Sequence, residues 1–193
     1  MDQSEFEQHL SKGEGLTIEF KRCGNQPEKD TYETICSFAN RQGGSIFLGV
    51  QDDRTVSGVP RQAELSMQRN IINVVSNPNA FNLTPSLEFE TIEYKEKMVL
   101  RIWVPMGSAV YRYKGDVYDR MADVDIKITS DDQVAGLYMR KRNHYSERKV
   151  YRFLSKDDLR ASSKTAQRHL AAMVERGFLI AEGATRDRKY RKA

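Results

Sequence analysis

The feature that most constrains the fold is a short apolar run, Ser45–Val50, which follows the pair Gly43-Gly44 and a helix-like segment, Tyr32–Asn40. A nearly continuous apolar run of this length is typical of a strand that is buried on both faces. The glycine pair is suited to end the helix in a tight turn. The pattern therefore predicts a helix, a turn and a central strand inside a mixed α/β domain.

Other helices and strands can be assigned from the spacing of apolar residues. Helices are expected at residues 2–11, 62–76 and 131–142, the last with Ser130 as N-cap and with Val134, Leu137, Tyr138 and Lys141 on one face. Strands are expected at Leu16–Lys21, Ser86–Tyr94, Met98–Val104, around Tyr111 and at Val117–Arg120. Ser86–Tyr94 and Met98–Val104 would pair across the turn Lys95-Glu96-Lys97. Together these elements predict an α+β domain with a mixed sheet over residues 1–142.

Residues 143–193 predict a second, smaller domain with the element order of a winged helix. The expected elements are helices at Tyr145–Leu154 and Lys164–Arg176, a terminating Gly177, a strand at Phe178–Ile180, a charged turn and a strand at Tyr190. Only Ser155–Ala161 separates the two helices, which leaves little room for a third. An abbreviated winged-helix-type segment is therefore expected.

Charge is distributed unevenly along the chain. From His144 onward there are 13 Lys and Arg against 6 Asp and Glu, a net charge of +7. The whole chain carries +4, so the first 143 residues carry −3. Such asymmetry suggests that the C-terminal segment binds a polyanion, and DNA or RNA is the expected partner.

Several basic and amide side chains of this segment are candidates for nucleic-acid contact. Lys164, Gln167 and Arg168 lie early on the expected recognition helix, where Gln and Arg have groups suited to adenine and guanine edges. Further candidates for phosphate contact are Arg186, Arg188 and Lys189 in and after the charged turn. The alternative interpretation is that these side chains form a solvated basic face on a helix whose role is to pack against the rest of the fold.

The composition excludes some other classes of protein. With 39% hydrophobic residues the chain can bury a core, and it has no run of about 18 apolar residues that could span a membrane. Its N-terminus lacks the profile of a signal peptide, so a cytoplasmic location is expected. Cys23 and Cys36 have no metal-ligand spacing and are expected to be structural thiols.

Two segments resemble a known family, the Schlafen AlbA-like domain. Gly13–Lys21 contains a Glu, four residues and Glu-Phe-Lys, and Ser37–Asp53 contains Phe-Ala-Asn, a Gly-Gly turn and a strand that ends in Gly-Val-Gln-Asp. Tyr118–Met121, continuing to Ile128, resembles the family's strand with Tyr, Arg and a small residue. The resemblance covers roughly residues 10–142. It implies a nucleic-acid-binding role, since bacterial relatives are often described as transcriptional regulators, sometimes with a C-terminal winged helix.

Schlafens of the nuclease type suggest a second function, metal-dependent cleavage of RNA by three carboxylates. Matched residue by residue, these fall on Glu14, Glu19 and Asp52, which together could hold Mg²⁺ or Mn²⁺, while Lys21 could contact a phosphate. The alternatives are a nucleic-acid-binding role for the same surface without cleavage, and purely structural roles. Glu14 could cap a strand, Glu19 could pair with Lys21 or Arg22, and Asp52 could make a turn. The chain resembles one lobe of the two-lobed eukaryotic core and has no counterpart of its zinc site.

Two further expectations concern ATP and assembly. The glycine-containing run Gly43–Gly49 lacks the order of a Walker A loop, so ATP is not expected, and Asn40 is expected to end a helix rather than bind a ligand. A single lobe leaves an apolar surface that its missing partner would cover, so a homodimer or small homo-oligomer is expected. The functions that remain are a DNA-binding regulator, a metal-dependent endoribonuclease and, third, a protein-interaction adaptor.

Overall fold

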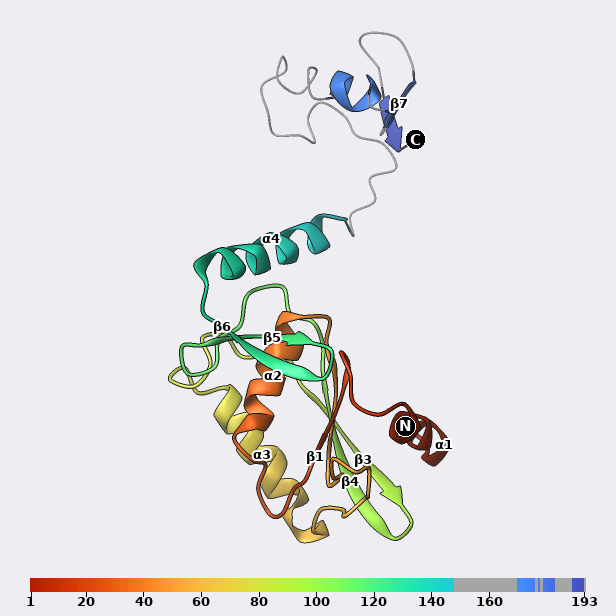
Figure 1. Ribbon diagram of the computed structural model, residues 1–193, viewed down its shortest axis with the longest axis vertical. Helices are drawn as coiled ribbons and strands as arrows, with labels where there is room; N and C mark the ends of the chain where they lie inside the picture. The colour runs from red at the N-terminus through yellow and green to blue at the C-terminus, as the bar shows by residue number, and fades with distance from the viewer. Residues whose placement is uncertain (148–169, 176, 178, 183–188, 193) are drawn as a thin grey trace. The chain divides into compact units, whose positions relative to one another are not determined.

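The computed structural model describes residues 1–147, 170–175, 177, 179–182 and 189–192, and the chain falls into two compact units, Met1–Asn143 and His144–Ala193 (Figure 1). No helix in these described ranges combines the length and the apolar character needed to cross a membrane.

The first unit is built on a four-stranded mixed sheet. Its strands are β1 (Ile18–Lys21), β2 (Gly44–Leu48), β3 (Glu88–Tyr94) and β4 (Lys97–Val104), in the order β1-β2-β4-β3. β1 runs parallel to β2, and the other two pairings are antiparallel. The mixed sheet expected from the sequence is confirmed.

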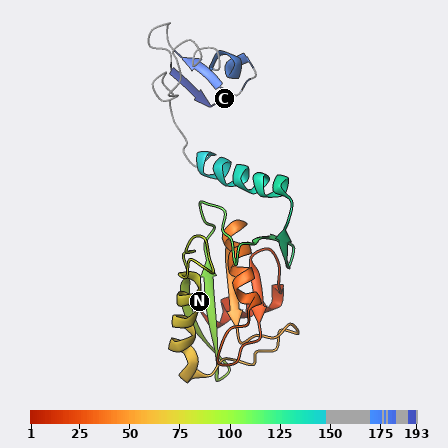
Figure 2. The same ribbon diagram turned by 90° about the vertical axis from the view of Figure 1, so that its left-hand side faces the viewer.

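Helices cover both faces of this sheet (Figures 1 and 2). On one face lie α2 (Asp30–Asn40) and α3 (Glu64–Val75), the latter preceded by the 3₁₀ turn η1 (Arg61–Ala63), and on the other lies α1 (Gln3–Lys12). Ile46 and Leu48 of β2 pack with α2 and α3, whereas Phe47 contacts Phe6 of α1 with ring centroids 5.4 Å apart. Every residue of β2 is buried, as the apolar run predicted.

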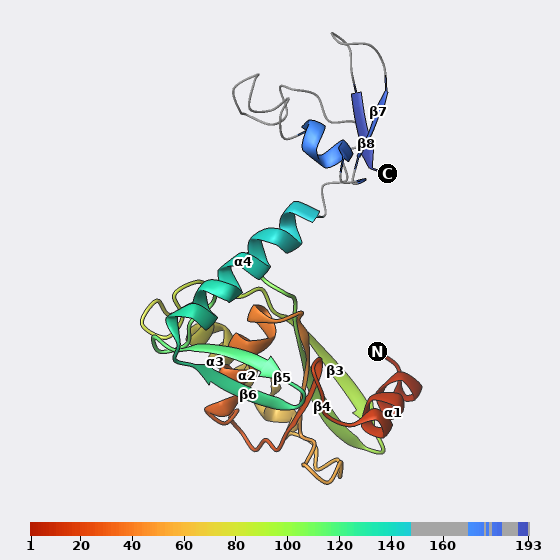
Figure 3. The same ribbon diagram turned by 45° about the horizontal axis from the view of Figure 1, so that its top comes forward.

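A separate hairpin, β5 (Val117–Met121) and β6 (Val124–Ile128), packs on α2 (Figure 3). The strand expected around Tyr111 does not form. Instead the Asn40 side chain accepts from the backbone N–H of Tyr111 at 2.8 Å and donates to its carbonyl at 2.9 Å and to that of Tyr118 at 2.8 Å. The Asn40 side chain thus supplies the hydrogen bonds that a neighbouring strand would give this segment, and it links α2 to β5.

The helix expected after Ser130 is α4 (Asp131–Glu147). Leu137 and Lys141 are buried, and Leu137 packs with Val110 and Val117. Tyr138, expected on the same face, is 46% exposed, because it follows Leu137 directly and so points about 100° away around the helix. The buried Lys141 donates from Nζ to the carbonyls of Ala39 and, at 2.8 Å, Gly107.

In the second unit, residues 170–175 are helical and are followed by an antiparallel pair, β7 (Leu179–Glu182) and β8 (Lys189–Lys192). Leu170 is buried against Val174 and Ala181. Lys189 is the first residue of β8. Lys164, Gln167, Arg168, Arg186 and Arg188 lie outside the described residues, as do the later part of the expected helix Tyr145–Leu154 and the start of Lys164–Arg176.

Candidate functional site

Two of the residues that the sequence singled out in the first unit, Lys21 and Asp52, lie at one end of the sheet. β1 and β2 are parallel and Lys21 pairs with Leu48, so the loops after both strands leave from the same end. Asp52 follows β2 by four residues. A hollow of about 540 Å³, the strand-end pocket, opens there and is lined by Lys21, Arg22, Glu28, Asp30, Gln51, Asp52 and Asp53.

Lys21 lies between two carboxylates. Its Nζ is 2.7 Å from Glu19 Oε1 and 2.7 Å from Asp30 Oδ2. Burial alone would lower the pKa of Lys21, but hydrogen bonds and charge attraction from Asp30 and Glu19 raise that pKa well above its usual value. Lys21 therefore stays charged and is already paired.

Glu19 is 5% exposed and faces two cations. One carboxylate oxygen accepts from Lys21 and the other from Arg120 Nη2. Burial raises the pKa of Glu19, although both cations pull it down. Both carboxylate oxygens of Glu19 are thus paired with cations of the fold. The pair with Lys21 is the structural role that the sequence left open for Glu19.

Glu14 and Asp52 are placed differently from Glu19. Glu14 Oε1 accepts a hydrogen bond from the backbone N–H of Phe20 at 2.9 Å. This contact with strand β1 agrees with the structural role that the sequence left open for Glu14, capping a strand. Asp52 lines the strand-end pocket, and its side chain forms no hydrogen bond or ion pair within residues 1–141. Asp52 and Asp53 are the two central residues of a turn in which the N–H of Arg54 donates to the Gln51 carbonyl at 2.8 Å, which is the structural role left open for Asp52, and Asp53 Oδ1 accepts from the N–H of Thr55 at 2.8 Å. This backbone hydrogen bond also lowers the pKa of Asp53.

In the structure, the side chains of Glu14, Glu19 and Asp52 do not form a group that could hold a metal ion. Within the described ranges, no cluster of three His, Cys, Asp or Glu side chains could hold a metal ion. The structure brings Glu19 and Lys21 together and adds Asp30, which the sequence analysis missed. The only signal for Asp30 was its place as an acidic residue in the first turn of α2.

Arg120, which the sequence placed on the Tyr-Arg strand without assigning it a role, organises the interior behind the pocket. Its side chain is completely buried and donates to the Gly15 carbonyl at 3.1 Å and 3.0 Å, to Asp125 at 2.9 Å and to Glu19. Its guanidinium carbon lies 5.0 Å from the centre of the Phe38 ring. Asp125 also accepts from Thr34 at 2.5 Å and from Ser37. The expected Tyr-Arg strand thus carries the central cation of a buried polar network.

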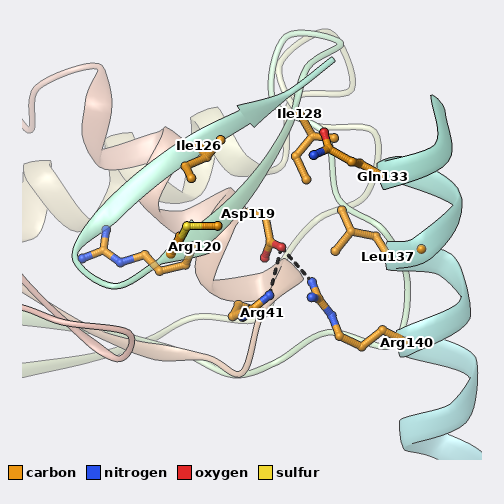
Figure 4. A pocket seen from close by; sticks show the side chains of 10 residues that line it. Arg41, Asp119, Arg120, Ile126, Ile128, Gln133, Leu137 and Arg140 are labelled. Atoms are coloured by element: carbon orange, nitrogen blue, oxygen red, sulfur yellow. Dashed lines mark hydrogen bonds and ion pairs between the residues drawn. The ribbon is translucent and has the colours of Figure 1, made fainter. Parts of the chain in front are cut away.

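On the outer side of the β5–β6 hairpin lies a second hollow, of about 350 Å³, between the hairpin and α4 (Figure 4). Ile126, Ile128 and Leu137 give it an apolar wall. At one side Arg41 and Arg140 both donate to Asp119 Oδ2, at 3.1 Å and 3.0 Å. Arg41 and Arg140 therefore share one carboxylate, so their charge is partly neutralised.

Both cysteines are free and buried. Burial raises the pKa of Cys23 to about 11 and that of Cys36 to about 12. Neither thiol forms a reactive thiolate at neutral pH, and the structural role expected for both agrees with their burial.

Comparison with known proteins identifies one family. Residues 14–129 match the family described as Schlafen, AlbA_2. The DIP2311 protein of Corynebacterium diphtheriae is 16% identical with a TM-score of 0.45, and the match covers 72% of this chain and 31% of that one. The N-terminal domain of a RecG-related protein of Nitrosomonas europaea is 21% identical with a TM-score of 0.43, and the match covers 68% of this chain and 95% of that one.

Proposed function

Because the chain belongs to the Schlafen AlbA_2 family, we propose that it binds nucleic acid and that its specific role is DNA-binding regulation. This proposal rests on one observation: the boundary between the two compact units lies at the point in the sequence where the net charge changes sign. The second compact unit is His144–Ala193, and this same segment carries the net charge of +7. Basic side chains that neutralise phosphates release counterions, so such a segment binds nucleic acid with strong salt dependence.

The finer proposal is an abbreviated winged helix in this unit. Helical residues 170–175, Gly177 and the pair β7–β8 follow one another in the order that such a fold requires. Lys164, Gln167 and Arg168 would then precede this helical stretch on the recognition helix. Arg186, Arg188 and Lys189 belong to the connection between β7 and β8 or to the start of β8, the place of a wing. Arg168→Ala should cost about 1–3 kcal/mol of DNA binding if Arg168 reads a base.

A metal-dependent endoribonuclease is the second candidate. The specific observation in its favour is that Asp30 and Asp52 line one pocket with Lys21, at the end of the sheet where Glu19 also lies. Mg²⁺ or Mn²⁺ takes oxygen ligands of this kind, and it would position a water for attack on a phosphate. Glu14 and Glu19 would have to leave their present partners to join such a site.

One assay separates the two functions. Labelled duplex DNA, single-stranded RNA and transfer RNA are each incubated with the full chain in EDTA and in Mg²⁺ or Mn²⁺, and both anisotropy and product length are measured. A DNA-binding regulator gives salt-sensitive anisotropy in EDTA and no products. Metal-dependent shortening of RNA would establish the nuclease instead. Neither binding nor cleavage would contradict both and favour a protein-interaction adaptor.

We also propose that the chain forms a homodimer through its first unit. The outer face of the β5–β6 hairpin exposes Met121 by 65%, Val124 by 56% and Ile126 by 37%. Apolar side chains gathered in this way favour association, and twofold pairing of identical chains is the commonest form. Sedimentation equilibrium at micromolar concentration should give twice the 22.2 kDa of one chain. A single-chain mass that persists through tenfold dilution would contradict this.

A further inference from the structure

A second cluster of cations lies at the same end of the sheet as the strand-end pocket. Lys21 pairs with Leu48 and Leu48 with Leu100 of β4, so the start of β4 and the β3–β4 turn are on this side. A hollow of about 260 Å³, the turn pocket, is lined by Leu10, Arg54, Val56, Tyr94, Lys95 and Lys97. Arg54 follows Asp52 by two residues, so one loop supplies residues to both pockets.

The three cations of the turn pocket are held by neutral partners. Lys97 Nζ donates to the Val56 carbonyl at 2.7 Å, and Arg54 Nη1 donates to the Ser11 carbonyl at 3.1 Å. Lys95 Nζ lies 4.8 Å from the centre of the Tyr94 ring. Among residues 1–141, whose side chains are described, none of the three forms an ion pair. Their positions are thus fixed while their charges are not neutralised.

The backbone helps to aim these side chains. Tyr94 pairs with Lys97, so Lys95 and Glu96 form a two-residue turn, and both have positive φ, 47° and 64°. Gly13 has no side chain, and a Cβ there would lie 2.7 Å from Arg54 Nη2. Gly13 therefore makes room for the guanidinium. Glu96, the other residue of the turn, lines a different hollow.

We propose that the turn pocket binds the phosphodiester backbone of a nucleic acid, so that Arg54, Lys95 and Lys97 extend the binding surface onto the first unit. This inference rests on the proposed nucleic-acid binding and adds a second contact region to it. Three cations that have no ion-pair partner among residues 1–141 and lie beside a tyrosine suit a single strand better than a duplex, because phosphates meet the cations and a base can lie against an aromatic or apolar wall. A strand held here would pass close to Asp52 and the strand-end pocket.

The test compares two triple variants of the full chain that remove the same charge. One is Arg54→Gln/Lys95→Gln/Lys97→Gln. The control is Arg69→Gln/Arg112→Gln/Lys114→Gln, whose cations lie elsewhere in the first unit and also form no ion pair within residues 1–141. Anisotropy is measured from low to moderate salt with single-stranded RNA and DNA of about 12 nucleotides, the length expected for such a groove.

The turn-pocket variant should bind about tenfold more weakly, and the slope of log Kd against log salt should fall by about 2–3, roughly one for each lost phosphate contact. The control should keep the slope of the wild-type chain. The charge-conserving variant Arg54→Lys/Lys95→Arg/Lys97→Arg should retain most of the affinity, which guards against a simple folding defect. Equal losses from RNA and DNA identify a backbone contact, and a loss confined to RNA adds a contact to the 2′-hydroxyl.

Other outcomes would overturn the inference. A slope that falls equally in both triple variants would mean that only net charge matters. A parallel loss of binding to poly-glutamate of matched charge would assign the pocket to acidic chains in general. If the wild-type chain binds nucleic acid and the turn-pocket variant matches it at every salt concentration, this inference alone fails. If the wild-type chain binds none, the proposed function fails with it.

Discussion

The strand-end pocket and the turn pocket lie at the same end of the sheet but differ in the groups that contact their cations. Lys21 lies between Glu19 and Asp30, and Arg120 behind it lies between Glu19 and Asp125. The cations of the turn pocket are oriented by carbonyls and a tyrosine ring. Cations paired with carboxylates hold the fold together, whereas cations fixed by neutral groups remain available to an anionic ligand. Substitutions in the two sets should therefore affect different measurements, stability in the first and binding in the second.

The largest effect is expected for Arg120→Met. Removing the buried guanidinium leaves Glu19 and Asp125 without their shared cation, and breaking a buried ion pair in this way costs about 3–5 kcal/mol. Urea unfolding followed by circular dichroism measures the loss as a lower midpoint. A matched Arg41→Met variant, which removes a half-buried cation from Asp119, should cost under about 1 kcal/mol. Similar costs for the two would contradict the distinction between buried and surface pairs.

The next effect concerns binding and compares the two units. Removing residues 144–193 takes away the net charge of +7 and should weaken nucleic-acid binding by well over tenfold at moderate salt, or more than about 1.4 kcal/mol. Anisotropy titrations of the truncated and full chains measure this difference. The residual affinity of the first unit should then depend on Arg54, Lys95 and Lys97. Unchanged affinity after truncation would overturn the leading role of the second unit.

Glu19→Gln and Asp52→Asn should separate structure from chemistry at the strand-end pocket. Glu19→Gln removes the charge that faces Lys21 and Arg120 and should cost about 1–3 kcal/mol of stability. Asp52→Asn alters a side chain without a described partner and should stay within about 0.5 kcal/mol. If RNA is cleaved in Mg²⁺ or Mn²⁺, both variants should lose that activity. Cleavage that persists in both would show that these carboxylates take no part in it.

The smallest effect is a pH dependence from Lys141. Burial lowers the pKa of Lys141 from 10.5 to about 8, and the charge of Arg140 adds to the shift. Between these two values the unfolded chain binds more protons than the folded chain, so this residue's contribution to stability rises with pH from about 8 to 10.5 and is lost as pH falls through that window. The difference in unfolding free energy between the wild-type chain and Lys141→Met should grow in favour of the wild type across this range. A difference that stays constant would contradict the shift.

The sequence predicted the sheet well because burial leaves a pattern that can be read locally. The run Ser45–Val50 identified β2, alternation identified β1 and β4, and pairing with β4 across a short turn identified β3. The strand expected near Tyr111 failed because Asn40, 71 positions away, supplies its hydrogen bonds, and no local pattern reports a partner so distant. Tyr138 was placed on the buried face of α4 although its helical position lies beside that face.

The candidate site was predicted only in its outline. Lys21 contacts Glu19 and shares a pocket with Asp52 because β1 and β2 run parallel and end on the same side, whereas the sequence predicted a mixed sheet without saying that these two strands pair. The roles of Arg120 and Asp30 could not be found in this way, since their importance comes from which carboxylate or cation faces them across the fold. The turn pocket was missed for the same reason, because Arg54 and Lys95 are far apart in the sequence.

In the two-residue turn at Lys95 and Glu96, the residues that would best stabilise the hairpin are not the residues that the turn pocket needs for binding. Left-handed backbone is adopted most readily by Asn and Gly, so a turn of this shape would hold together better with Asn-Gly than with Lys-Glu. An engineer who optimised the hairpin for heat resistance would therefore replace Lys95 first, and the gain in melting temperature would be accompanied by the loss of one of three cations in the turn pocket. Libraries of this chain screened for thermostability alone should accordingly be enriched in variants that bind single strands less tightly.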